Sequence, residues 1–179
     1  MTAAARTAAA LVRELAARDP ETAARLARML TEAPQGGGIR TPQAAISVLV
    51  PHLAGHEVEH VAVIAVDRRL RVLDVARLSS GTDGAAIVDP RTILRWALTR
   101  PRSGAYGILL AHNHPSGDPT PSREDIGVTA KLAQACAAVG ILLLDHLVVV
   151  DDPYAGLRAS SLAEMGHVPT QRTSYGFTA

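Results

Sequence analysis

Apolar and polar positions change their spacing several times along the chain, which predicts alternating helices and strands. Segments with apolar residues at helical spacing begin after cap residues such as Thr41 and Asp89, each followed by a proline. Denser runs of Val, Leu and Ile bounded by polar turns predict buried strands. The expected helices cover two short pieces of residues 3–32 and residues 42–53, 90–99 and 122–139. The expected strands cover residues 57–66, 70–78, 106–111 and 141–150, with a short edge pairing in residues 154–162.

The first two predicted strands are separated only by the polar residues 67–69, which predicts an antiparallel hairpin. A hairpin combined with interspersed helices predicts an α/β fold in which a mixed β-sheet packs between helices. In the helix over residues 90–99, we expect Leu94, Trp96 and Leu98 to face the core.

Length and composition favour one principal domain with appendages. The chain has 179 residues, of which 47% are hydrophobic, and this is enough for one sizeable core. An N-terminal helical segment with a glycine-rich joint is expected in residues 1–38, the domain in residues 39–166 and a mobile polar tail in residues 167–179.

Charge and cysteine content narrow the class of protein. A net charge of +1 creates no strong field that would attract nucleic acid or an anionic membrane. Cys136 is the only cysteine, so no intramolecular disulfide can form, and its apolar helical surroundings predict a small buried side chain rather than a catalytic thiol. The N-terminal stretch lacks the hydrophobic region of a secretory signal and no apolar run reaches membrane-spanning length, so a cytoplasmic protein without a membrane partner is expected.

A histidine pair follows the third principal apolar run. Side chains alternate between the two faces of a strand, so His112 and His114 point to the same side while Asn113 turns away. A loop rich in glycine and proline then leads to Ser122, and Asp125 lies in the first turn of the next helix. Two imidazoles and one carboxylate leave one tetrahedral position open, as a hydrolytic Zn²⁺ site requires. The sequence therefore predicts that His112, His114 and Asp125 bind zinc.

Asp125 also has an interpretation that needs no metal. Ser122 as the helix N-cap and Asp125 three residues later form a near capping box, in which each side chain bonds the other's backbone N–H. The two interpretations do not exclude each other.

These residues together resemble the JAMM motif of the JAB/MPN metalloprotease family. That motif reads His-x-His-Pro, six residues and Ser-x-x-Asp, and residues 112–125 match it without a gap. The string His-Asn-His-Pro-Ser-Gly-Asp-Pro is similar to the RadC-like branch of the family. The strings Leu-Asp-His-Leu-Val at residues 144–148 and Ser-Leu-Ala-Glu-Met-Gly at residues 161–166 are similar to it too, and the likeness covers about residues 39–166.

The resemblance implies a fold, an activity and two further roles. It implies the cytidine-deaminase-like three-layer sandwich of the family and a zinc-dependent hydrolase of amide or isopeptide bonds, acting on a peptide or an isopeptide-linked protein. It also implies that Ser122 stabilises the tetrahedral intermediate and that a glutamate on an earlier strand is the general base. Glu57 and Glu59 lie on one face of the first predicted strand, so alternation does not choose between them. The register of the family favours Glu59.

Four more polar residues lie near the predicted site. Asp145 and His146 fall within an apolar strand, where ionisable groups are costly unless paired, so they either orient a metal ligand or make a structural hydrogen bond. Ser116 and Asp118 lie in the loop beside the metal, where substrate contact and turn chemistry both explain them. The remaining histidines lack ligand spacing: His52, His56, His60 and His167.

The sequence also bears on three functions other than the hydrolase. A zinc deaminase needs His-x-Glu and Pro-Cys-x-x-Cys, which a chain with one cysteine does not have. A DNA-repair-associated accessory protein is the alternative that the RadC name suggests, but near-neutral charge, 3% aromatic residues and the lack of a recognisable helix-hairpin-helix argue against direct nucleic-acid binding. A third hypothesis is a scaffold in which the metal has only a structural role.

Overall fold

The computed structural model describes residues 38–54, 56–80, 89–99, 104–152 and 156–168. The chain divides into two units, residues 1–36 and 37–179, and all the described residues belong to the second. The predicted N-terminal helices and most of the predicted tail lie outside the described residues.

A five-stranded mixed sheet forms the centre of this unit, in the order β2-β1-β3-β4-β5. Three of the neighbouring pairs are antiparallel, and β3 with β4 is parallel. The parallel pair needs a crossover, which α5 provides. The strands are β1 His60–Val66, β2 Val72–Ser80, β3 Gly107–Asn113, β4 Leu142–Asp152 and β5 Gly156–Ser161. The helices are α3 Pro42–Leu53, α4 Pro90–Thr99 and α5 Arg123–Ala138.

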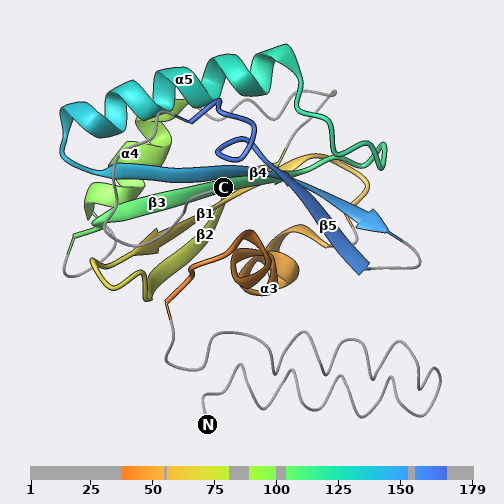
Figure 1. Cartoon of the computed structure of the whole chain (residues 1–179), viewed down its shortest axis with the longest axis horizontal. Coiled ribbons are helices and arrows are strands. Elements are labelled where there is room, and N and C mark those ends of the chain that lie inside the picture. The colour runs from red at the N-terminus through yellow and green to blue at the C-terminus, as the bar shows by residue number, and fades with distance from the viewer. Residues whose placement is uncertain (1–37, 55, 81–88, 100–103, 153–155, 169–179) are drawn as a thin grey trace, which may run out of the picture. The chain divides into compact units, whose positions relative to one another are not determined.

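Helices cover both faces of the sheet (Figure 1). The helix α3 packs on one face, while α4 and α5 lie against each other on the opposite face. Every residue of β1 and β3 is buried, as expected for central strands with helices on both sides. The predicted α/β fold, a mixed sheet between helices, is therefore confirmed.

Within the described residues every predicted element is present, but some boundaries and one core residue differ. The first strand begins at His60 rather than at residue 57, and the third extends to Asn113 rather than ending at residue 111. The prediction that Leu98 belongs to the core is wrong, because this residue is 53% exposed. The buried residues of α4 follow the spacing 93, 96 and 97, and a residue one step further along the helix turns by about 100° toward solvent.

The helix α5 begins after Ser122 and ends before Gly140, as the sequence predicted. Ser122 is its N-cap, and Gly140 follows the C-cap with a φ of 73°, a left-handed conformation that suits glycine. Cys136 is buried in the core on this helix, and burial raises the pKa of its thiol to about 11. The expectation of an inert buried cysteine is consistent with both facts. Within the described part of the chain, no helix is long and apolar enough to cross a lipid bilayer.

Candidate metal centre

At the end of β3, the neighbouring side chains of His112 and Asn113 point to opposite faces of the sheet and have different partners. His112 continues the face of Ile108 and Leu110, which packs under α4 and α5, and it is only 1% exposed. Asn113 points the other way: its Oδ1 accepts the backbone N–H of His60 at 2.8 Å, and its Nδ2 donates to the Val58 carbonyl at 3.1 Å. These two bonds hold the backbone on both sides of Glu59, a role that sequence reasoning missed.

The capping box of α5 brings Asp125 to the histidines. The Asp125 backbone N–H donates to Ser122 Oγ at 3.0 Å, and the Ser122 backbone N–H donates to Asp125 Oδ2 at 2.7 Å. Asp125 Oδ1 then lies 3.3 Å from His112 Nε2, and Oδ2 lies 3.7 Å from His114 Nε2. Asp125 therefore caps the helix and also joins a cluster of side chains that could hold a metal ion, as the sequence allowed.

The separations between these atoms suit one small divalent ion. His112 Nε2 and His114 Nε2 are 2.9 Å apart, and the two imidazole–carboxylate distances are 3.3 and 3.7 Å. Ligands about 2.0–2.2 Å from a tetrahedral zinc lie roughly 3.3 Å from one another. The separations of His112 Nε2 from His114 Nε2 and from Asp125 Oδ1 are close to that value, and the 3.7 Å distance from His114 Nε2 is to the other Asp125 oxygen, Oδ2. The donor set of two imidazoles and a carboxylate is also one that zinc binds.

The hydrogen bonding of His114 leaves its Nε2 lone pair facing the other members of the cluster. Its Nδ1 lies 2.8 Å from the Asp118 carbonyl oxygen, which can only accept, so Nδ1 carries the proton and the neutral ring has a lone pair on Nε2. That lone pair faces His112 Nε2 at 2.9 Å. Two nitrogens this close require a proton or a metal ion to bind them both. The residues therefore fit a divalent metal.

Glu59 joins the same group of atoms, whereas Glu57 does not. Glu59, His112, His114 and Asp125 offer ligand atoms that all lie within 4.8 Å of one another. Glu59 Oε1 is 3.7 Å from His112 Nε2, and its side chain is 22% exposed. Glu57, two residues earlier, is exposed and outside this group. Strand alternation could not choose between the two, and the structure places Glu59 at the cluster.

Comparison with known proteins identifies the domain. The family model described as "RadC-like JAB domain" matches residues 39–164. The chain belongs to this RadC-like family. It is 43% identical to a UPF0758 protein of Symbiobacterium thermophilum, over 68% of this chain and 50% of that one. It is 35% identical to a UPF0758 protein of Caldanaerobacter subterraneus, over 82% of this chain and 60% of that one. The chain thus spans a little over half the length of these curated relatives.

Charge in the RadC-like site is distributed to favour an ionised Asp125. Partial burial alone would raise the pKa of this carboxyl, but His112 and the hydrogen bonds from Ser122 outweigh burial and hold the pKa well below its usual value. Asp125 is therefore a carboxylate at neutral pH, which is the form that binds a cation.

Two polar residues of β4 have different surroundings. His146 is 3% exposed and contacts His112, and burial, followed by the neighbouring His112, lowers its pKa to about 3. Asp145 is fully buried and accepts hydrogen bonds from Ser161 Oγ at 2.7 Å and from the Ala163 backbone at 3.0 Å. Burial raises the pKa of Asp145 despite these bonds. Its bonds connect β4 to the turn after β5, which is a structural role.

Ser116 and Asp118, the loop residues predicted to contact substrate, lie in the loop next to His114. Asp118 contributes its backbone carbonyl to His114, while its exposed carboxylate accepts the Thr120 backbone N–H at 2.9 Å. Ser116 Oγ accepts the Asp118 backbone N–H at 3.4 Å. Turn chemistry thus explains both side chains in this structure, and contact with a substrate stays a prediction.

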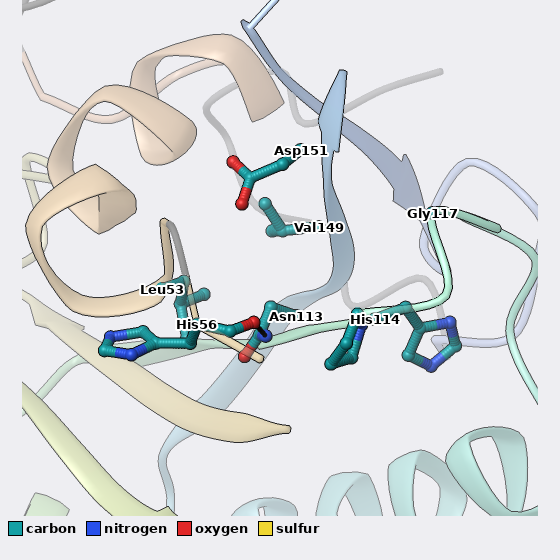
Figure 2. A pocket seen from close by; sticks show the side chains of 8 residues that line it. Leu53, His56, Asn113, His114, Gly117, Val149 and Asp151 are labelled. Carbon is teal, nitrogen blue, oxygen red and sulfur yellow. Dashed lines mark hydrogen bonds between the residues drawn. The ribbon is translucent and has the colours of Figure 1, made fainter. Parts of the chain in front are cut away.

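A small cavity of about 70 Å³ lies beside His114 (Figure 2). His114 and Asn113 line it from the end of β3, while His56 follows α3 and Asp151 comes from β4. Leu53 and Val149 line the cavity as well, so a hollow of mixed polar and apolar lining, with room for a few water molecules or a small chemical group, lies beside one residue of the RadC-like centre.

Proposed function

We propose that this chain is a zinc-dependent hydrolase of amide or isopeptide bonds. The observation that carries the proposal is the convergence of His112, His114 and Asp125 within 3.7 Å of one another, with the Glu59 carboxylate beside them. Membership in the RadC-like JAB domain family supports the same chemistry.

Three protein ligands would hold the metal through nitrogen and oxygen atoms. These are His112 Nε2, His114 Nε2 and a carboxylate oxygen of Asp125, which is a common donor set for zinc. When bound, zinc would polarise the carbonyl of the scissile bond and lower the pKa of a water molecule at the open position.

Glu59 is the proposed general base and acid. Its carboxylate is partly exposed and lies 3.7 Å from His112 Nε2, so it can reach a water molecule beside the cluster. In the proposed reaction, Glu59 takes a proton from the attacking water and gives it to the leaving amine. The hydrogen bonds of Asn113 to the backbone at residues 58 and 60 fix the main chain on both sides of this residue.

Ser122 is the proposed donor to the oxyanion of the tetrahedral intermediate. Its hydroxyl donates to Asp125 Oδ2 at 2.6 Å, so in the proposed step the hydroxyl keeps its proton and redirects this hydrogen bond from the carboxylate to the substrate oxygen as charge develops there. Asp125 Oδ2 would keep the bond from the Ser122 backbone N–H, at 2.7 Å. The carboxylate therefore loses only one of two hydrogen bonds from Ser122 in that step.

Removal of the metal tests the proposed activity. The zinc-loaded chain is expected to cleave members of a library of peptides and isopeptide-linked peptides, and prior dialysis against a chelator should abolish cleavage. Added zinc should restore it. Chromatography with mass spectrometry of the products measures both. A chain that binds zinc yet cleaves nothing in the library would contradict the hydrolase and favour a structural metal.

A further inference from the structure

A series of buried hydrogen bonds begins at His112 Nδ1, the ring nitrogen that does not face the metal cluster. His112 Nδ1 lies 2.8 Å from His146 Nε2, and His146 Nδ1 lies 2.6 Å from Thr129 Oγ1. Thr129 Oγ1 in turn donates to the Asp125 carbonyl oxygen at 2.6 Å. His112, His146 and Thr129 are 1%, 3% and 0% exposed, so water does not compete for these bonds.

We propose that Thr129, acting through His146, fixes the tautomer of His112 that leaves its Nε2 free to bind the metal. The inference rests on the proposed metal centre and adds a positioning function for two residues outside the ligand set. No catalytic step is assigned to either residue.

Which atom donates in each of these hydrogen bonds follows from the number of protons that each group has. A carbonyl oxygen can only accept, so the single hydroxyl proton of Thr129 is used on Asp125. Thr129 Oγ1 must then accept from His146, which places the His146 proton on Nδ1 and leaves a lone pair on its Nε2. That lone pair accepts the proton on His112 Nδ1. His112 Nε2 is therefore left without a proton on the side that faces His114 and Asp125.

The same series of hydrogen bonds also connects two of the three proposed metal ligands. It starts on the ring of His112 and ends on the backbone of Asp125, one helical turn before Thr129 on α5. The strand β4 contributes only His146, which lies between the two elements. A shift of α5 relative to β3 would break these bonds, so the same atoms set the tautomer of His112 and the place of Asp125.

Two substitutions of Thr129 separate hydrogen bonding from packing. Thr129→Val keeps the shape of the side chain and removes the hydroxyl, whereas Thr129→Ser keeps the hydroxyl and removes a methyl group. In the full chain, Val should weaken zinc binding about 10- to 100-fold, the usual cost of losing such an outer contact, while Ser should stay near wild type. Competition with a chromogenic zinc chelator measures the affinities.

The control is Thr99→Val in α4. The Thr99 hydroxyl also donates to the carbonyl four residues earlier, that of Arg95, at 2.7 Å, but no bond of the described residues connects it to the metal cluster. Its replacement should leave zinc affinity unchanged. If Thr129→Val binds zinc like wild type, or if Ser is as weak as Val, the proposal is wrong.

Ring-proton NMR of wild-type chain tests the same claim without any variant. Long-range ¹H–¹⁵N spectra should show His146 protonated on Nδ1 alone, in both metal-free and zinc-loaded protein. A proton on His146 Nε2 would overturn the proposal even if zinc binds. Because neither affinity nor ring protonation depends on substrate cleavage, failure of the tautomer proposal is distinguishable from failure of the proposed hydrolase.

Discussion

Replacing Glu59 by glutamine is expected to abolish hydrolysis while leaving zinc content near that of wild type. Glutamine has almost the same size and can still accept a hydrogen bond, but it cannot take a proton from water at neutral pH. Loss of a general base lowers the rate by about 10²- to 10⁴-fold. The measurement pairs turnover of a cleaved substrate with elemental analysis of the same protein sample.

Glu57→Gln is the matched control for this change. Glu57 lies two residues earlier and is exposed outside the cluster, so its neutralisation should leave both turnover and zinc content unchanged. If the Glu59 variant turns over substrate at the wild-type rate, the proposed mechanism is wrong. If it instead loses zinc, Glu59 is a ligand and not a base.

Replacing His112 by alanine is expected to reduce the zinc content from about one ion per chain to background. The change removes one of three protein ligands, and it leaves His146 Nε2 without the donor that the His112 ring provides at 2.8 Å. An unpaired buried acceptor costs about 1–3 kcal/mol, so the free energy of unfolding should fall as well. Elemental analysis after dialysis measures the zinc, and urea unfolding measures the stability.

His167→Ala separates this effect from the general loss of a histidine. His167 is exposed and is not among the residues that share the cluster. Its variant should keep both zinc and stability. Zinc retained at the wild-type level by the His112 variant would show that the ion binds elsewhere.

Much of the site could be predicted because it depends on local geometry. Strand alternation puts His112 and His114 on one face, and the spacing from Ser122 to Asp125 sets a capping box in the first turn of α5. Both rules act within a few residues of the chain. They are confirmed by the positions of these side chains.

What the sequence could not show depends on contacts between distant segments. Thr129 was not recognised, since only the packing of α5 on β4 brings its hydroxyl to His146. Asn113 was correctly expected to face away from the metal, but its partners lie more than fifty residues earlier, so its hold on Glu59 was hidden. Leu98 was misplaced because apolar character alone does not fix which way one residue of a helix turns.

The substrate and the partners depend on more than the domain that this chain shares with its relatives. The matched relatives are nearly twice as long as the part that this chain covers, so the substrate of the proposed hydrolase and any partner stay proposals. The domain boundaries at residues 38 and 166 and the DNA-repair alternative likewise stay predictions.

Diffraction from crystals of the zinc-loaded chain, with anomalous data collected at the zinc absorption edge, tests the central claim most directly. The account predicts one anomalous peak about 2.0–2.2 Å from His112 Nε2, His114 Nε2 and an Asp125 carboxylate oxygen, with no protein atom at the fourth position. A peak elsewhere, or one that Glu59 completes as a fourth protein ligand, would contradict it.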